Sequence, residues 1–138
     1  MDHIRYLDIS TNRLTGVFPG SLGQMAELVH LSAHSNGLAG EVPADALSKL
    51  SKLNYLNLKH NSLRGKGEDL PIAQLPELRY VNMRHNLLDG GMPYRNVTEP
   101  FPSLVHLDLA SNQLDGDIPS QWFHGTTSLR YLSLQDNR

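Results

Sequence analysis

The chain has 138 residues, a length that suits one globular domain, and its 39% hydrophobic and 19% charged residues are typical of a folded protein. Its 12 lysine and arginine residues against 14 acidic residues give a net charge of −2, which excludes the basic field of a nucleic-acid-binding protein. Cysteine is absent and no apolar run approaches the roughly 18 residues of a spanning helix, which excludes disulfides, thiolate metal ligands and membrane insertion by this segment.

One phrase recurs six times along the chain and predicts a series of short strands. Its copies begin at about residues 4, 28, 53, 78, 104 and 129, at intervals of 24 to 26 residues. Each copy reads L-x-x-L-x-L-x-x-N-x-L, in which the alternation of Leu107, Asp108 and Leu109 indicates a strand with one buried face. Because a single strand cannot bury that face alone, we expect the six strands to stack in parallel over one shared core.

A second phrase follows four of the six strands and describes the other side of each repeat. It reads L-x-G-x-Φ-P, with Φ an apolar residue, and starts at Leu14, Leu38, Leu88 and Leu114. Glycine allows unusual φ values and close approach of chains, while proline favours an extended segment and prevents a long helix. The third repeat keeps Gly65 but delays its proline to Pro71, which predicts an irregular loop at that point.

Together these phrases resemble the leucine-rich repeat in its plant-type form, over essentially the whole chain. The resemblance implies a leucine-rich repeat solenoid of the α/β horseshoe class. Such a solenoid is a curved right-handed coil with a parallel β-sheet on its concave face and extended or 3-10 turns on its convex face. We therefore expect residues 1–138 to form a single leucine-rich repeat domain.

Neither end of the sequence shows the polar capping unit that repeat solenoids need. Met1 already occupies an apolar position of the repeat, and the chain stops at Arg138, directly after the sixth asparagine of the phrase. The sequence therefore predicts a segment of a longer protein. The alternative is a complete small protein whose ends are covered by a partner or by end-to-end self-association.

An asparagine ends the strand phrase in all six repeats. Its amide can satisfy backbone groups of adjacent turns that would otherwise be buried without partners. We therefore expect a structural ladder rather than a binding role. The six asparagines are Asn12, Asn36, Asn61, Asn86, Asn112 and Asn137.

The residue before the second leucine of the phrase is an aromatic or imidazole ring in every repeat. Rings stacked at the strand spacing of about 4.8 Å form a stiff amphipathic stripe, and such rings are favoured anchors in recognition sites. The structural alternative is that tyrosine forms strands well and packs on its neighbours across a sheet. Both interpretations remain open for these positions, which are Tyr6, His30, Tyr55, Tyr80, His106 and Tyr131.

Polar columns of mixed sign follow the rings along each strand. The middle repeats carry a locally basic region that consists of Lys59, His60, Arg84 and His85. Carboxylates lie toward the ends, among them Asp108. We expect a ligand with an acidic or hydroxyl-rich feature to be centred on the basic region, with Asp108 also among the binding residues.

Patterns for catalysis or metal binding are missing from the sequence. The 7 histidines form no HExxH motif, and neither a P-loop nor a nucleophile elbow occurs, so we expect no enzyme, no metal and no cofactor. Asn96 begins the single N-x-S/T triplet and is a glycosylation candidate in a convex insertion. Trp122 and Phe123 stand where other repeats carry leucine, which predicts core filling.

Proteins of the plant-type family include receptor ectodomains and secreted inhibitors of cell-wall enzymes. The resemblance thus implies a non-catalytic recognition module, extracellular or at the cell surface, that binds a protein, peptide or glycan through its concave sheet. Six strands with about four exposed columns give a face of roughly 350 Å², below the ~800 Å² that each partner of a stable protein interface contributes. One alternative is a structural subunit of a larger assembly, and another is ice binding, which the lack of a threonine column disfavours.

Overall fold

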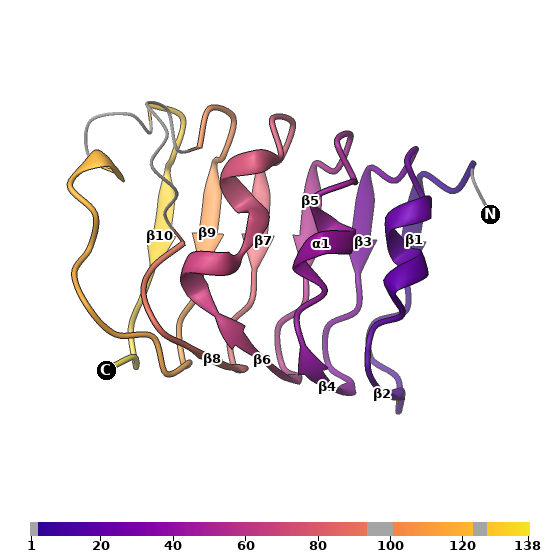
Figure 1. Cartoon of the computed structure of the whole chain (residues 1–138), viewed down its shortest axis with the longest axis horizontal. Coiled ribbons are helices and arrows are strands. Elements are labelled where there is room, and N and C mark those ends of the chain that lie inside the picture. The colour runs from indigo at the N-terminus through magenta and orange to yellow at the C-terminus, as the bar shows by residue number, and fades with distance from the viewer. Residues whose placement is uncertain (1–2, 94–100, 123–126) are drawn as a thin grey trace.

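The computed structural model describes residues 3–93, 101–122 and 127–138. Its strands lie side by side in a row that follows the chain, with the two termini at opposite ends of the row (Figure 1). Each repeat contributes one rung, and we number the rungs one to six from the N-terminus. The triplet at Asn96 and the side chain of Phe123 lie outside the described residues.

Six strands of three residues each form the inner sheet. Every strand pairs in parallel with the next rung in an unshifted register, so that Leu31 lies between Leu7 and Leu56. This confirms the parallel stack that the alternating leucines predict. The strands are β1 (Tyr6–Asp8), β3 (His30–Ser32), β5 (Tyr55–Asn57), β7 (Tyr80–Asn82), β9 (His106–Asp108) and β10 (Tyr131–Ser133).

The extended segments after the asparagines form a second parallel sheet, which we call the outer sheet. Its strands are β2 (Thr15–Gly16), β4 (Gly37–Glu41), β6 (Ser62–Lys66) and β8 (Leu87–Asp89). The sequence predicts extended backbone here, but it does not reveal that these segments pair with one another. The glycine of the L-x-G-x-Φ-P phrase has positive φ in each rung that contains it, as at Gly40 (φ +79°), which explains why this position is glycine.

Short helical turns connect the outer sheet to the next inner strand. They are η1 (Gly20–Gln24), α1 (Ala44–Leu47), η2 (Gly67–Asp69) and η3 (Pro71–Gln74). Rung three absorbs its delayed proline in the additional turn η2, where a Cβ atom on Gly67 would overlap the carbonyl oxygen of Gly91. The carboxylate of Glu68 accepts a hydrogen bond of 2.6 Å from the backbone N–H of Gly91, which fastens this turn to rung four.

The core lies between the two sheets and is continuous through the middle rungs. The inward leucines are fully enclosed there, as shown by Leu31 and Leu107 at 0% exposure. Trp122 is buried and meets Phe101 edge to face at 5.3 Å between ring centroids, which confirms the predicted core filling at this position. Leu132 in rung six is 38% exposed, because no further rung covers it in this chain.

Candidate functional site

The rings on the inner sheet form one stacked column that runs through all six rungs. Adjacent ring centroids are 4.1 to 4.3 Å apart, and no pair of ring planes is tilted by more than 15°. The unshifted register of the strands causes this stacking, because it sets the same position of each repeat side by side. The four inner rings therefore have both faces covered and present their edges outward. Tyr6, at one end of the column, is 63% exposed.

The two histidines in this column are held toward their neutral form. Burial lowers the pKa of His30 and of His106, and the nearby carboxylates of Asp8 and Asp108 oppose this shift only in part. The Nε2 atom of His106 is buried without a hydrogen-bond partner among the described residues. Burial also raises the pKa of the Tyr55 hydroxyl. The column thus consists of uncharged rings at neutral pH.

The polar column next to the rings is buried in rungs two to five, whereas Asp8 in rung one is exposed and Ser133 in rung six is partly exposed. In rung three the Nδ2 atom of Asn57 donates to the hydroxyl of Tyr55 at 3.2 Å, and Asn82 does the same to Tyr80 at 3.4 Å in rung four. Asp108 is 4% exposed, accepts hydrogen bonds from Asn82 Nδ2 and from the backbone N–H of Ala110, and so does not lie at the surface as the sequence led us to expect. Its carboxylate positions neighbouring groups within the sheet.

The basic residues lie beyond the C-terminal ends of the inner strands. β5 ends at Asn57, so Lys59 and His60 belong to the turn that follows rather than to the exposed strand columns that the sequence suggested. His60 and His85 both have φ of 53°, a left-handed conformation that non-glycine residues seldom adopt. Their exposed imidazole rings stack at 4.5 Å with an angle of 28° between planes. The structure thus brings the predicted basic region together as a paired cluster.

Backbone hydrogen bonds hold this cluster in register. The N–H of His60 donates to the carbonyl of Arg84 at 2.8 Å, and the N–H of Ser35 donates to the carbonyl of Lys59 at 2.9 Å. Partial burial lowers the pKa of His60, and the neighbouring charges of His85, Lys59 and other basic groups lower it further. The paired turns therefore concentrate basic groups, and no carboxylate among the described residues forms an ion pair with them.

The asparagines bond across rungs directly below this cluster. Asn86 donates from Nδ2 to the carbonyls of Leu58 and Met83, both at 3.0 Å, and its Oδ1 accepts from the N–H of Leu63. The same three-way pattern repeats at Asn36, Asn61, Asn112 and Asn137. Asn12 bonds only to Ile9 and Ser10 in its own turn, since no described rung precedes it. The hydrogen bonds of these amides go to backbone groups of the same and the adjacent rung.

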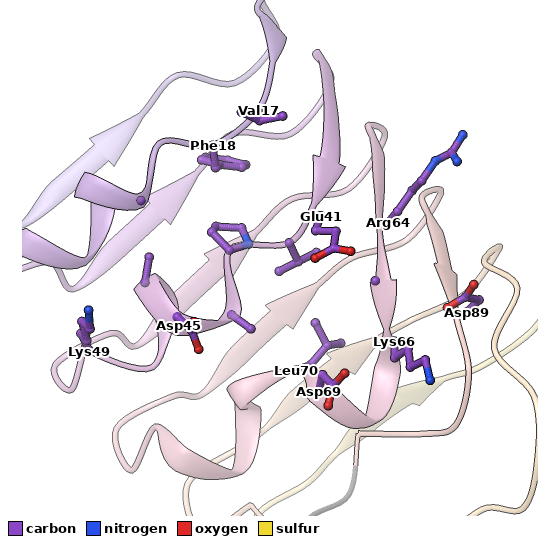
Figure 2. A pocket seen from close by; sticks show the side chains of 16 residues that line it. Val17, Phe18, Glu41, Asp45, Lys49, Arg64, Lys66, Asp69, Leu70 and Asp89 are labelled. Carbon is purple, nitrogen blue, oxygen red and sulfur yellow. The ribbon is translucent and has the colours of Figure 1, made fainter.

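A hollow of about 1050 Å³ lies on the opposite side of the molecule, over the outer sheet. Figure 2 shows Val17 and Phe18 on one side of it, and Arg64 and Lys66 on the other. Acidic side chains also line it, including Glu41, so that neither sign of charge prevails. The sequence does not reveal this hollow, because it depends on how the outer segments of four rungs are spaced. Its mixed, open lining makes it a weaker candidate site than the inner face.

Residues 3–93, 101–122 and 127–138 contain no group of three or more histidine, cysteine or acidic side chains arranged to hold a metal ion. Within the same residues, no helix is both long and apolar enough to cross a membrane.

Comparisons with solved structures agree with this architecture. The plant peptide hormone receptor RGFR1 in complex with RGF2 is 31% identical over 97% of this chain and 20% of its own, with a TM-score of 0.85. The ectodomain of the receptor kinase SOBIR1 from Arabidopsis thaliana is 28% identical over 93% of this chain and 66% of its own, with a TM-score of 0.80. The Arabidopsis receptor kinase HAESA, in complex with the peptide hormone IDA and the co-receptor SERK1, is 25% identical over 99% of this chain and 22% of its own, with a TM-score of 0.90. This chain therefore spans about a fifth of the RGFR1 and HAESA chains and about two thirds of the SOBIR1 chain.

Comparisons of sequence point to the same family. A search among curated proteins finds no significant match. A family model for the leucine-rich repeat matches residues 39–88 and 98–138, which together make up more than half of the chain, and a second leucine-rich repeat model matches residues 3–25. The chain belongs to the leucine-rich repeat family.

Proposed function

We propose that this chain is a non-catalytic recognition segment that binds a peptide along the ring column and the paired basic turns of its inner face. The observation that carries the proposal is the unbroken stack of six rings beside a cationic cluster on one face. The similar structures of RGFR1 and HAESA contain bound peptide hormones, which supports a peptide as the ligand class. Because those structures are receptors, we also propose an extracellular or cell-surface setting.

The geometry suits an extended peptide better than a globular partner. Ring edges carry partial positive charge, so they attract electron-rich groups such as carbonyl and carboxylate oxygens. Lys59 and Arg84 add full positive charges at the end of the same face. In rungs two to five the polar column next to the rings is buried, which narrows the accessible face there below the roughly 350 Å² expected from the strand spacing. A surface of this width accommodates one extended chain and is well below what stable capture of a folded protein requires.

A peptide-selection experiment tests this function. Peptides selected from a random display library on the immobilised 138-residue chain would be measured by calorimetry against the wild type and against Tyr55→Ala with Tyr80→Ala. Because these rings lie at the centre of the column, we expect the double variant to bind about tenfold more weakly or worse. The matched control is Arg64→Ala with Lys66→Ala on the outer sheet, which should leave the affinity unchanged. Selected peptides that lost affinity only with the outer variant would refute binding at the inner face.

A further inference from the structure

Rungs three and four carry the same succession of polar groups on the inner face. Rung three reads YLNLKHN and rung four reads YVNMRHN, so each presents a tyrosine, an asparagine, a cation and a histidine in the same order. β5 and β7 pair with Tyr55 opposite Tyr80 and Asn57 opposite Asn82. Equivalent groups therefore stand beside one another, and no other adjacent pair of rungs repeats this succession. The result is a site formed by two rungs, with two permanently charged side chains, Lys59 and Arg84, and two imidazole rings.

The surroundings leave these cations without acidic partners. Rung two places His34 and Ser35 beside the pair, and rung five places Ala110 and Ser111 on its other side. The described residues contain no ion pair or side-chain hydrogen bond of Lys59 or Arg84. Asp108 is buried in bonds to Asn82 and Ala110, and the carboxylate of Asp136 lies two rungs from His85, where it accepts a hydrogen bond from the hydroxyl of Ser111. An external anion would meet no competing carboxylate at this position.

The histidine pair makes the charge of the site depend on its occupant. Two neutral imidazoles stack without repulsion, as His60 and His85 do at 4.5 Å. Protonation of His60 is opposed by its partial burial and by the nearby basic groups of Lys59, Arg84 and His34, which lower its pKa. A bound carboxylate would remove much of that opposition, because an opposite charge within a few ångströms favours the charged form of a base. Anion binding and proton uptake by the pair are thereby coupled.

We propose that rungs three and four form an acid-favoured binding site for a carboxylate of the peptide ligand, in which Lys59 and Arg84 supply constant charge and the His60–His85 pair takes up a proton on binding. This inference rests on the proposed peptide-binding function and assigns the part of the ligand held at these turns. The direction follows from linkage: the complex binds more protons than the free chain, so affinity rises as the pH falls. An aspartate side chain stays ionised down to about pH 4.5, so the ligand keeps its charge through the histidine range.

The test uses the whole 138-residue chain and a capped tetra-aspartate peptide, with a capped tetra-asparagine peptide as the uncharged control. Calorimetry at about pH 7.5 and about pH 5.5 should show tetra-aspartate binding about tenfold tighter at the lower pH, since one proton taken up contributes at most about tenfold per pH unit. Tetra-asparagine should bind weakly at both values. Nuclear magnetic resonance of the imidazoles should show the titration of His60 moving to higher pH when tetra-aspartate is present.

Two variants separate the roles of the four side chains. In His60→Asn with His85→Asn the new residues tolerate a positive φ, so this variant should fold, and its affinity for tetra-aspartate should be nearly the same at the two pH values. Lys59→Gln with Arg84→Gln should lose binding at both pH values. Arg64→Gln with Lys66→Gln removes the same two charges from the outer sheet and should behave as the wild type.

Specific results would overturn the inference. Equal affinity for tetra-aspartate at the two pH values, or a pH dependence that persists in the histidine variant, would exclude the coupled proton uptake. Equal loss in the outer variant would show a general charge effect instead of a site. Library peptides that depend on Tyr55 and Tyr80 but show no such pH dependence would refute this inference and leave the proposed function intact. If tetra-aspartate bound with proton uptake but the tyrosine variant had no effect on peptide binding, the carboxylate site would be supported and binding along the ring column would be refuted.

Discussion

The middle rungs and the end rungs of this solenoid share one sequence pattern but differ in what surrounds them. The central leucine of the strand is 0% exposed at Leu107 in rung five and 38% exposed at Leu132 in rung six. The strand sequences HLD and YLS both place this leucine between a ring and a polar residue, and both strands belong to the same sheet. The number of covering neighbours therefore decides burial, so a repeat gains most of its stability from the adjacent rungs rather than from itself.

The largest effect on stability is expected from Leu107→Ala, which we compare with Leu132→Ala. Removing the enclosed side chain of Leu107 should lower the free energy of unfolding by about 3 kcal/mol, since it loses buried area and leaves a cavity between two rungs. Leu132 loses less buried area and leaves an opening that water fills, so about 1 kcal/mol is expected. Urea denaturation followed by circular dichroism measures both values. Similar losses at the two positions would contradict the dependence on neighbouring rungs.

The asparagine ladder shows the same difference between middle and end rungs, because Asn12 lacks the hydrogen bonds to a neighbouring rung that the other five asparagines make. Asn86 is 5% exposed and serves three backbone groups in two rungs, so Asn86→Ala should cost about 2 kcal/mol by leaving those groups unsatisfied. Asn12 is exposed and bonds only within its own turn, so Asn12→Ala should cost about 0.5 kcal/mol. Both variants would be measured by the same urea titration. An equal cost would mean that the bonds within one turn, rather than those between rungs, provide the stabilisation.

Much of the fold follows from the repeat phrase alone, because each repeated position has to meet its own equivalent in the next rung. The register of the inner sheet and the stacking of the rings are direct consequences of this rule. The outer sheet is different, since its strands are short and rich in glycine and lack the alternation that marks a strand in sequence. Pairing there depends on the inner sheet having already brought the rungs together.

The candidate site was predictable in composition but not in exposure. The sequence identifies the basic residues of rungs three and four, yet the left-handed backbone of His60 and His85 shows only in the structure. Burial of Asp108 also escaped prediction, because it depends on the side chain of Asn82 in the neighbouring rung. The alternation of leucines assigns Asp108 to the face of the strand opposite the core, but it does not show how much of that face the neighbouring side chains cover.

The smallest expected effect is the dependence of stability on pH that arises from the two histidines of the ring column, which lie in rungs two and five. Burial lowers the pKa of His30 and His106 below the ordinary value of about 6.5. Below that value the unfolded chain binds more protons than the folded chain, so stability should fall as the pH drops from about 6.5 toward about 5 and should be insensitive to these groups above it. Thermal unfolding recorded across this range measures the slope.

Replacing both rings by tyrosine, as His30→Tyr with His106→Tyr, should flatten that slope, because tyrosine continues the stack without taking up a proton in this range. The remaining slope would come from His60, whose pKa is also lowered and whose ring pair lies outside the column. Asp8 and Glu27 do not interfere, since their pKa values are lowered by hydrogen bonds to Ser10 and Lys52 and they titrate only in more acidic solution. A slope as steep in the tyrosine variant as in the wild type would mean that the stacked column does not resist protonation, and that its rings are less enclosed in solution than their neighbours in the middle rungs suggest.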